Sequence, residues 1–360
     1  MDRDNIMRGI LEKNARERDG FRLHPELKYL FFEVTTRCNL SCLHCGSSCT
    51  AWNGSDMPTD YITRVLESVE NGCHSEKPML CITGGEPLLY KDLIKVMSYA
   101  ADCGFLWGMT TNATRIDDEK ACSLYEAGLA SVTVSIDGLE KSHDWFRNTP
   151  GSYVLANKGL RALLKHVPDH ARVDVITVVS RRNLSELEEL YKRLSDTGIR
   201  SWRIVNMEPI GRARQNAGLM LSPDEYRRMF EFIREKHFDS TAMEVSYGCS
   251  HYLTTQYERM VRPYCFTCMA GLQVASIACN GDIIACLDIE RRPELVQGNI
   301  RKNDFWETWE NGFSFFRNDR SDLSSQCAGC PDRLFCAGDS AHTWDYDRNE
   351  PMIYMKKVLS

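Results

Sequence analysis

The sequence contains no long hydrophobic run. None of its apolar stretches approaches the roughly 20 residues that a membrane-spanning helix needs. The opening segment, MDRDNIMRGILEKNARERDG, mixes both charges and lacks the apolar core of a secretory signal. We therefore expect a soluble, cytoplasmic protein without a membrane partner.

An excess of basic charge is also absent. The chain has 44 Lys and Arg against 50 Asp and Glu, which gives a net charge of −6. Nucleic-acid binding needs a concentrated basic face, and the arginine pairs beginning at Arg181, Arg227 and Arg291 have acidic neighbours that indicate solvated surface. No nucleic-acid partner is expected. Internal repeats and low-complexity segments are absent as well, which indicates ordinary globular domains.

Cysteine, by contrast, is abundant. The 16 cysteines among 360 residues lie in a long chain that we expect in a reducing compartment, where such richness indicates metal binding rather than disulfides. Most of them fall into two groups, within 38–49 and within 249–336. The sequence thus predicts two metal-bearing regions.

Residues 29–207 alternate between strand-like and helix-like segments. The predicted strands are Leu30–Thr36, Met79–Thr83, Phe105–Thr111, Ser131–Ile136, Val173–Val179 and Arg200–Met207, and the predicted helices lie near 59–72, 91–103, 118–127, 153–166 and 184–196. This alternation implies parallel pairing with right-handed crossovers. We predict an α/β fold, a partial (β/α)6 TIM-like barrel.

Two sequence patterns predict helix starts. Ser222 can cap a helix with Pro223 in its first position and Glu225 in its first turn, and Asn183 with Glu186 resembles a capping box. Beyond about residue 250 the pattern changes to short strands, turns and cysteines. We therefore place a domain boundary between 216 and 260.

The first cysteine group forms the loop Cys38-x3-Cys42-x2-Cys45, directly after the first predicted strand. Loops at the carboxyl ends of barrel strands carry catalytic groups in this architecture. Three thiolates can bind three irons of a four-iron cubane and leave the fourth iron open to a substrate or cofactor. A zinc site is the alternative, with His44 or Cys49 as the fourth ligand.

The cysteine loop resembles the signature of the radical S-adenosylmethionine (radical SAM) superfamily. Further segments match that family where later strands end: Gly84-Gly85-Glu86-Pro87, Thr110-Thr111-Asn112, Ser135-Ile136-Asp137-Gly138, Arg147 within His143-Asp144-Trp145-Phe146-Arg147, and Met207-Glu208-Pro209-Ile210-Gly211-Arg212. The family often has glycine where this chain has Ala113. The match extends over most of the predicted barrel.

The resemblance implies a set of contacts to S-adenosylmethionine. The glycine-rich segment is expected to hold the methionine amino group, Ser135 the ribose, Arg147 the carboxylate, and the segment from Met207 the adenine. The full expected set is His44, Gly84, Gly85, Glu86, Pro87, Thr111, Asn112, Ser135, Asp137, Arg147, Met207 and Pro209. It also implies that a reduced [4Fe–4S] cluster on Cys38, Cys42 and Cys45 cleaves the sulfonium and yields a 5′-deoxyadenosyl radical, which abstracts a substrate hydrogen.

The second cysteine group resembles the SPASM domain, a module that binds auxiliary iron–sulfur clusters. The pattern runs from Cys268-x12-Gly281-x4-Cys286 to Cys327-x2-Cys330-x5-Cys336, with Asn280-Gly281-Asp282 as its hairpin turn. Trp306, Trp309 and the phenylalanines that follow are expected to pack on the barrel. The resemblance implies one or two auxiliary clusters, with Cys265, Cys268 and Cys286 on one and Cys327, Cys330 and Cys336 on the other.

This chain departs from the SPASM pattern at two positions. Ser340 stands where the pattern has a cysteine, and no cysteine follows Cys336. Each auxiliary group therefore lacks one thiol. The candidates that we consider to fill the gaps are Cys249, Cys279, Asp339 and His342, and a structural zinc knuckle is the alternative for the paired cysteines.

The expected layout has five segments: an N-terminal helical extension (1–28), the radical SAM partial barrel (29–215), a linker helix region (216–260), a SPASM-like auxiliary cluster domain (261–345) and a C-terminal tail (346–360). By resemblance, we expect an oxygen-sensitive enzyme that modifies a peptide or protein and draws electrons from a flavodoxin or ferredoxin-like reductant. The alternatives are a dehydrogenase or epimerase of a small molecule, and a non-catalytic iron–sulfur electron carrier. The Gly-Gly-Glu-Pro segment argues against the carrier, which needs no amino-acid clamp.

Overall fold

The computed structural model describes residues 3–49, 54–237, 243–248 and 251–359. Within these ranges one mixed sheet of ten strands runs in the order β10-β9-β8-β1-β2-β3-β4-β5-β6-β7. Its strands are β1 (Tyr29–Glu33), β2 (Met79–Thr83), β3 (Trp107–Thr111), β4 (Leu129–Ser135), β5 (Arg172–Val179), β6 (Ser201–Asn206), β7 (Glu244–Tyr247), β8 (Val274–Ile277), β9 (Asp282–Ile284) and β10 (Gly298–Asn299). A separate pair consists of β11 (Trp344–Asp345) and β12 (Glu350–Pro351).

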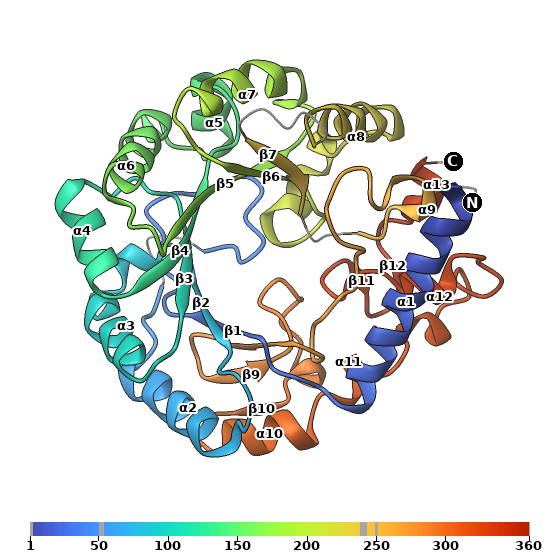
Figure 1. Ribbon diagram of the computed structural model, residues 1–360, viewed down its shortest axis with the longest axis horizontal. Helices are drawn as coiled ribbons and strands as arrows, with labels where there is room; N and C mark the ends of the chain where they lie inside the picture. Colours follow the sequence, from blue (N-terminus) through green and yellow to red (C-terminus); the bar gives the residue numbers. More distant parts are fainter. Residues whose placement is uncertain (1–2, 50–53, 238–242, 249–250, 360) are drawn as a thin grey trace.

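Strands β1 to β6 pair in chain order and are all parallel. Helices connect them and cover the outside of the sheet (Figure 1): α2 (Thr59–Gly72), α3 (Leu93–Asp102), α4 (Asp118–Glu126), α5 (Glu140–Phe146), α6 (Ser152–His166), α7 (Leu187–Ser195) and α8 (Pro223–His237). This arrangement confirms the predicted partial barrel, with strand ends displaced by a few residues. Helix α5 was not predicted.

Helix α2 shows why these segments fold as they do. Its apolar residues Ile62, Val65, Leu66 and Val69 recur at helical spacing and are all buried. They join one hydrophobic core with strand residues such as Phe32. Burial of each such side chain contributes about 1.5–3 kcal/mol, so the helices hold the strand ends, and the loops that follow them, in fixed positions.

The sheet extends beyond the six predicted strands on both sides. Strand β7 lies in the region expected to be a linker and pairs parallel with β6. Strand β8 pairs parallel with β1, with Tyr29 opposite Val274, and β9 returns antiparallel to β8. The predicted hairpin turn is present, with Gly281 at φ +90°. Backbone hydrogen bonds between β8 and β1 therefore hold the second cysteine region against the strand that precedes the first cysteine loop.

Both predicted helix starts lie at the expected positions, since α8 begins at Pro223 and helical turns begin at Leu184, but only the first has its predicted cap. The Ser222 backbone nitrogen donates to the Glu225 carboxylate at 2.7 Å, and the Glu225 nitrogen donates to the Ser222 hydroxyl at 3.4 Å. Asn183 and Glu186 form no such box. The Asn183 amide oxygen accepts from the Ser180 nitrogen at 2.8 Å, and Glu186 accepts from the Leu139 nitrogen at 2.8 Å. A bond within the preceding turn occupies the Asn183 oxygen, and a distant partner occupies Glu186, so neither side chain forms the predicted cap.

The remaining helices belong to the ends of the chain: α1 (Arg3–Leu23), α9 (Thr254–Tyr257), α10 (Phe305–Asn311), α11 (Ser314–Arg317), α12 (Arg333–Cys336) and α13 (Met355–Leu359). Helix α1 packs along α12 and α9 (Figure 1). The Asn14 amide donates to the Thr267 hydroxyl at 2.8 Å. Helix α10 packs on α2 and buries Trp309, as predicted. Among the described residues, no helix is long and apolar enough to cross a bilayer.

Candidate active site and cluster sites

The Cys38–Cys45 loop lies at the carboxyl end of β1. Cys38 and Cys42 are buried, Cys45 is half-buried, and all three pack together with Leu40 and Cys49. Burial raises the pKa of the Cys38 thiol to about 12, so metal binding must release its proton. No three metal-binding side chains among the described residues are grouped tightly enough to hold a single ion. An all-thiol donor set of this kind fits an iron–sulfur cluster.

The glycines of the Gly84–Pro87 segment make room for the cysteine loop. A Cβ atom on Gly84, at φ +153°, would lie 2.3 Å from the Thr35 oxygen, and one on Gly85 would lie 2.1 Å from the Arg37 oxygen. The Gly85 and Glu86 nitrogens each donate to these carbonyls at 2.8 Å. The segment after β2 is therefore locked to the loop after β1.

The Glu86 carboxylate ties β2 to the end of β3. It is buried and accepts from the Thr111 hydroxyl at 2.7 Å, the Asn112 nitrogen at 2.8 Å and the Leu88 nitrogen at 3.2 Å. Burial raises the pKa of Glu86, although these hydrogen bonds oppose the shift. The Asn112 amide also donates to Asn39 of the cysteine loop at 3.0 Å. Binding of an ammonium by Glu86 stays a prediction.

A buried ion pair lies beneath the cysteine loop. The Arg147 Nη2 atom lies 2.7 Å from the Asp137 carboxylate, and its Nη1 atom donates to the Cys42 sulfur at 3.6 Å. Burial disfavours the charged form of Asp137, but Arg147, His44 and His143 outweigh it and lower the pKa of this carboxyl. Arg147 is thus already paired with a carboxylate, and its expected role toward the cofactor carboxylate stays a prediction.

Two histidines flank this pair. The His44 ring stacks on Phe146 at 4.3 Å and its Nε2 atom lies 3.5 Å from Asp137. The His143 Nδ1 atom accepts from the Asp137 nitrogen at 3.1 Å. Burial lowers the pKa of each histidine to about 4, so both are neutral at pH 7. His143 was quoted in the sequence but given no role, because nothing marks it before α5 is placed.

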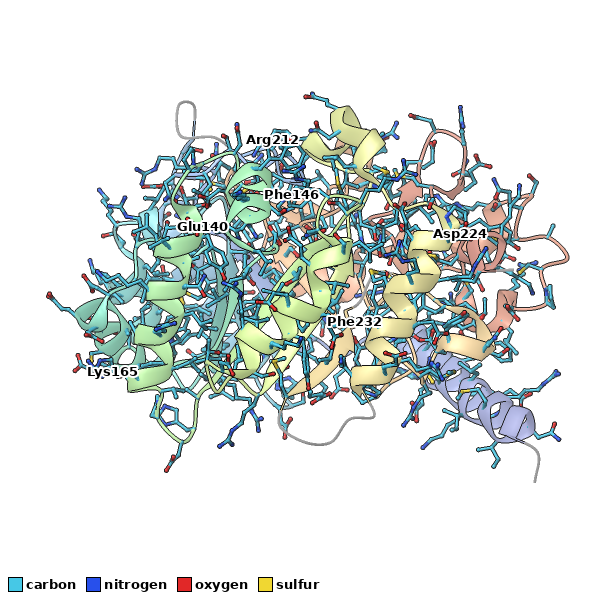
Figure 2. All side chains as sticks on the ribbon, turned by 90° about the horizontal axis from the view of Figure 1, so that it is seen from above. Glu140, Phe146, Lys165, Arg212, Asp224 and Phe232 are labelled. Atoms are coloured by element: carbon cyan, nitrogen blue, oxygen red, sulfur yellow. The ribbon has the colours of Figure 1, made fainter. Side chains whose placement is uncertain are left out.

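Arg212 closes the site from the end of β6. Its Nε atom donates to the Cys42 oxygen and its Nη1 atom to the Cys49 oxygen, each at 2.8 Å. Gly211, at φ +52°, has the Gly46 oxygen 2.1 Å from the position of a Cβ. Figure 2 shows Arg212 and Phe146 toward the same end of the barrel, opposite Lys165. The sequence places Arg212 at the end of the last motif, but nothing in it indicates these contacts to the cysteine loop.

The other expected contacts lie near this end of the barrel. Ser135 ends β4 and Met207 follows β6, and both are buried. The Pro209 carbonyl accepts from Arg214 at 2.9 Å, and Pro87 begins a short 3-10 turn. The structure therefore brings together the strand-end segments that the sequence singled out, and their contacts to S-adenosylmethionine stay predictions.

A cavity of about 670 Å³ lies between the cysteine loop and the hairpin β8–β9. Thr36 and Ser47, which flank the cysteine loop, line one side, and Cys279, Cys286 and Val296 line the hairpin side. Its volume falls within the range of small-ligand sites. The cavity thus borders the residues that flank the first cysteine loop and Cys286 of the second region.

The cysteines of the second region lie in neighbouring sets, and Cys336 belongs to two of them. Cys327, Cys330 and Cys336 line one small pocket. Cys265 and Cys268 pack beside Phe266, and the Cys268 sulfur accepts from the Ala341 nitrogen at 3.3 Å. Cys286 lies on the wall of the larger cavity. Cys336 also packs in the cluster that contains Cys265 and Cys268, so the division into two ligand groups stays a prediction.

The structure limits the candidates for the missing ligands. The Asp339 carboxylate accepts from the Tyr252 nitrogen at 2.8 Å and pairs with the His251 ring at 2.6 Å, so it is already engaged. The Cys279 sulfur donates to the Ser55 oxygen at 3.3 Å and lies at the larger cavity. Cys249 lies outside the described residues.

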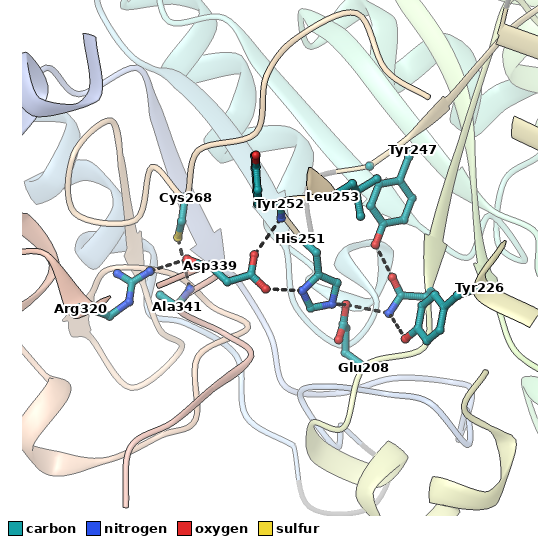
Figure 3. Close-up of polar contacts among 12 residues, drawn as sticks. Glu208, Tyr226, Tyr247, His251, Tyr252, Leu253, Cys268, Arg320, Asp339 and Ala341 are labelled. Atoms are coloured by element: carbon teal, nitrogen blue, oxygen red, sulfur yellow. Dashed lines mark hydrogen bonds and ion pairs between the residues drawn. The ribbon is translucent and has the colours of Figure 1, made fainter. Parts of the chain in front are cut away.

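His251 joins the barrel to the cluster domain (Figure 3). Its other ring nitrogen lies 2.9 Å from Glu208, which follows β6. Burial opposes a charge on His251, but Glu208 and Asp339 outweigh it and raise its pKa to about 10. Asn206 continues the chain of contacts from Glu208 to Tyr226. No sequence pattern marked this network.

A parallel partial barrel with a three-thiol loop after β1, joined to a second cysteine-rich region, defines an iron–sulfur enzyme of the S-adenosylmethionine-dependent class. Comparison with known families agrees. Residues 32–194 match the radical SAM superfamily, and residues 268–331 match an iron–sulfur cluster-binding domain, SPASM. The chain belongs to the radical SAM superfamily and carries a SPASM domain, and its cofactors are [4Fe–4S] clusters and S-adenosylmethionine.

Individual relatives differ in what their names describe. The chain is similar to an AdoMet-dependent heme synthase of Methanosarcina barkeri, at 28% identity over 90% of this chain and 95% of that protein. It is also similar to the mycofactocin maturase MftC of Mycobacterium tuberculosis, at 27% identity over 86% and 77%. The solved structure of anSMEcpe with bound AdoMet and a Cp18Cys peptide superposes with a TM-score of 0.69 at 18% identity, over 93% and 94%. This last likeness shows the fold alone.

Proposed function

We propose that this radical SAM enzyme abstracts a hydrogen atom from a peptide or protein substrate held in the 670 Å³ cavity. The bound cluster and S-adenosylmethionine supply the one-electron chemistry that removes the hydrogen. The chain contributes three thiols that hold the cluster, the Asp137–Arg147 pair that supports their loop, and the cavity that positions the substrate. An external flavodoxin or ferredoxin-like protein is proposed as the electron donor.

The ion pairs on the cavity wall favour a peptide substrate over a ligand with several carboxylates. Arg291 pairs with Glu33 at 3.1 Å, and Arg292 pairs with Glu294 at 2.8 Å. A carboxylate ligand that took Arg291 away from Glu33 would leave this buried carboxylate without its cation, which costs free energy. A peptide offers groups of both signs and a polar backbone, so it suits a wall on which charges of both signs are already balanced.

A small-molecule substrate is the second candidate, and the relatives favour it. Several of them are named heme synthases and match nearly the whole chain. A porphyrin bearing carboxylates would fit the volume of the cavity. In that case Arg291 or Arg292 would exchange its present carboxylate partner for one of the substrate. The two candidates thus predict different consequences for these arginines.

The test is anaerobic incubation of the reconstituted enzyme with reductant, S-adenosylmethionine and either of two substrate sets, read by mass spectrometry. One set holds peptides encoded beside the gene, and the other holds iron coproporphyrin III. We expect a mass change in a peptide and none in the porphyrin. Conversion of the porphyrin alone would overturn the peptide proposal.

A matched pair of variants tests whether the cavity is the substrate site. Val296→Trp fills the cavity, whereas Val154→Trp adds the same side chain at an exposed position of α6. We expect Val296→Trp to lower substrate conversion at least tenfold while S-adenosylmethionine cleavage continues, and Val154→Trp to change neither. Equal conversion by both variants would place the substrate elsewhere.

A further inference from the structure

One polar side chain contacts the second cysteine region from outside the SPASM pattern. Cys327, Cys330 and Cys336 line a pocket together with residues of the segment 351–356. The Tyr354 hydroxyl in this segment lies 3.2 Å from the Cys330 sulfur. No cysteine follows Cys336 in the sequence, so this segment cannot supply the thiol that three cysteines lack.

Several contacts hold Tyr354 over the cysteine pocket. The Lys356 ammonium lies 3.2 Å from Asp332, which stands between Cys330 and Cys336. The Arg227 guanidinium of α8 donates to the Val358 oxygen at 3.0 Å. These contacts fix the chain just after Tyr354. The Lys357 backbone nitrogen also donates to the Tyr354 carbonyl oxygen at 2.9 Å, at the start of α13. The phenol is therefore positioned by the fold.

We propose that Tyr354 is the fourth ligand of an iron–sulfur cluster held by Cys327, Cys330 and Cys336. Its oxygen would bind the iron that the three thiolates leave without a protein ligand, as tyrosine binds iron in some haem proteins. The phenol releases its proton to solvent when the iron–oxygen bond forms, and no electron is transferred. The proposal rests on the SPASM domain and is independent of the substrate.

The other oxygen groups in the pocket are less suited to this position. The Asp332 carboxylate pairs with Lys356, and Asp339 is engaged with His251. Tyr252 also lines the pocket, and its buried hydroxyl has no hydrogen-bond partner among the described residues. Tyr354, by contrast, contacts a cysteine sulfur directly. Tyr252 is therefore the rival ligand and provides a matched control.

The experiment compares the full-length wild type with Tyr354→Phe, Tyr354→Cys and Tyr252→Phe after anaerobic reconstitution. Iron content, visible absorption and resonance Raman spectra are measured on each protein. We expect iron–phenolate bands in the wild type and in Tyr252→Phe, and their loss in both Tyr354 variants. Tyr354→Cys should retain the wild-type iron content, because a thiolate completes the cluster.

Three results would overturn the proposal. The first is a wild type without iron–phenolate bands, and the second is a Tyr354→Phe spectrum identical to that of the wild type. The third is an unchanged iron content when Cys327, Cys330 and Cys336 are all replaced by Ala, since about four irons should then be lost. Tyr354→Cys keeps the test valid if Tyr354→Phe folds poorly. Cleavage of S-adenosylmethionine is scored separately, so failure here does not touch the proposed function.

Discussion

At the scale of single residues, Arg147 connects a buried carboxylate to the cysteine loop. It neutralises the buried Asp137 carboxylate and contacts the Cys42 sulfur. Arg147→Ala leaves that carboxylate buried without its cation, and we expect a loss of about 3–5 kcal/mol in the free energy of unfolding. Urea titration measures the free energy of unfolding. Arg193→Ala is the control, because Arg193 forms an exposed ion pair with Glu189 that stabilises the fold by less than about 1 kcal/mol.

The same variant tests the cofactor contact predicted from sequence. If Arg147 also binds the carboxylate of S-adenosylmethionine, the affinity measured by calorimetry should fall roughly tenfold or more, because a charge-assisted hydrogen bond contributes about 1.5–3 kcal/mol. An affinity equal to that of Arg193→Ala would mean that another residue holds the carboxylate. A wild-type unfolding free energy would contradict the structural role.

His251 makes stability depend on pH. Its folded pKa is raised to about 10, whereas an unfolded histidine titrates near ~6.5. The stabilisation by Glu208 and Asp339 is therefore fully present below about pH 6.5 and is lost as the pH rises toward 10. His251→Gln should be less stable than the wild type at pH 6.5, and the gap should narrow at pH 9.5. Urea midpoints at both pH values measure this.

A control separates this effect from general alkaline destabilisation. Val154 is an exposed, uncharged residue of α6. Val154→Ala leaves the protons bound by the folded and unfolded chain unchanged, so it should follow the wild-type pH profile. A gap between His251→Gln and the wild type that stays constant from pH 6.5 to 9.5 would show that His251 is not charged in the folded protein.

At the scale of elements, the close approach of two loops is the feature most sensitive to mutation. Gly85→Ala places a methyl group 2.1 Å from the Arg37 oxygen and 2.9 Å from the Cys38 Cβ. Because backbone must move, we expect a loss of about 1–3 kcal/mol in the free energy of unfolding together with reduced iron on the first cysteine loop. Thermal unfolding and iron analysis measure both.

Gly9→Ala is the matched control for this substitution. No atom lies within 4 Å of the added Cβ in α1, and alanine favours a helix by about 1 kcal/mol. It should leave the iron content unchanged and raise the stability slightly. Iron loss equal in both variants would contradict the account of the Gly84–Pro87 segment.

The elements also show what the sequence can and cannot predict. Strands β1 to β6 were predictable because each is a short apolar run between amphipathic helices. Strand β7, Glu244–Tyr247, was missed because it is short and its burial depends on β6 and α8. The Asn183 cap failed because the Asn183 side-chain nitrogen donates to the distant Asp137 oxygen at 2.8 Å, while its oxygen accepts from Ser180 in the preceding turn. Local sequence patterns identify helices and strands, whereas contacts with distant residues decide which hydrogen bond a capping side chain makes.

For the candidate site, the motifs could be predicted but their mutual contacts could not. The thiol loop and the Gly84–Pro87 segment are visible in the sequence because glycine and cysteine spacing is specific. The pairing of Arg147 with Asp137 and the three contacts of Arg212 to the cysteine loop depend on strand order in the folded sheet. Tyr354 was unremarked because nothing in the sequence links it to Cys330.

At the scale of the whole molecule, the two cysteine regions form one connected structure. Strand β8 pairs with β1, and His251 joins Glu208 after β6 to Asp339 after Cys336 (Figure 3). The cavity proposed for the substrate borders Cys286 of the second region. The cluster domain therefore forms part of the wall of the proposed active site.

The central claim is that Cys38, Cys42 and Cys45 hold the cluster at which S-adenosylmethionine is cleaved. The most direct test measures 5′-deoxyadenosine after anaerobic incubation with dithionite and S-adenosylmethionine. The reconstituted wild type should form it, and the Cys38/Cys42/Cys45→Ala variant should form none while it keeps the iron of the SPASM domain. Formation of 5′-deoxyadenosine by that variant at the wild-type rate would contradict the account.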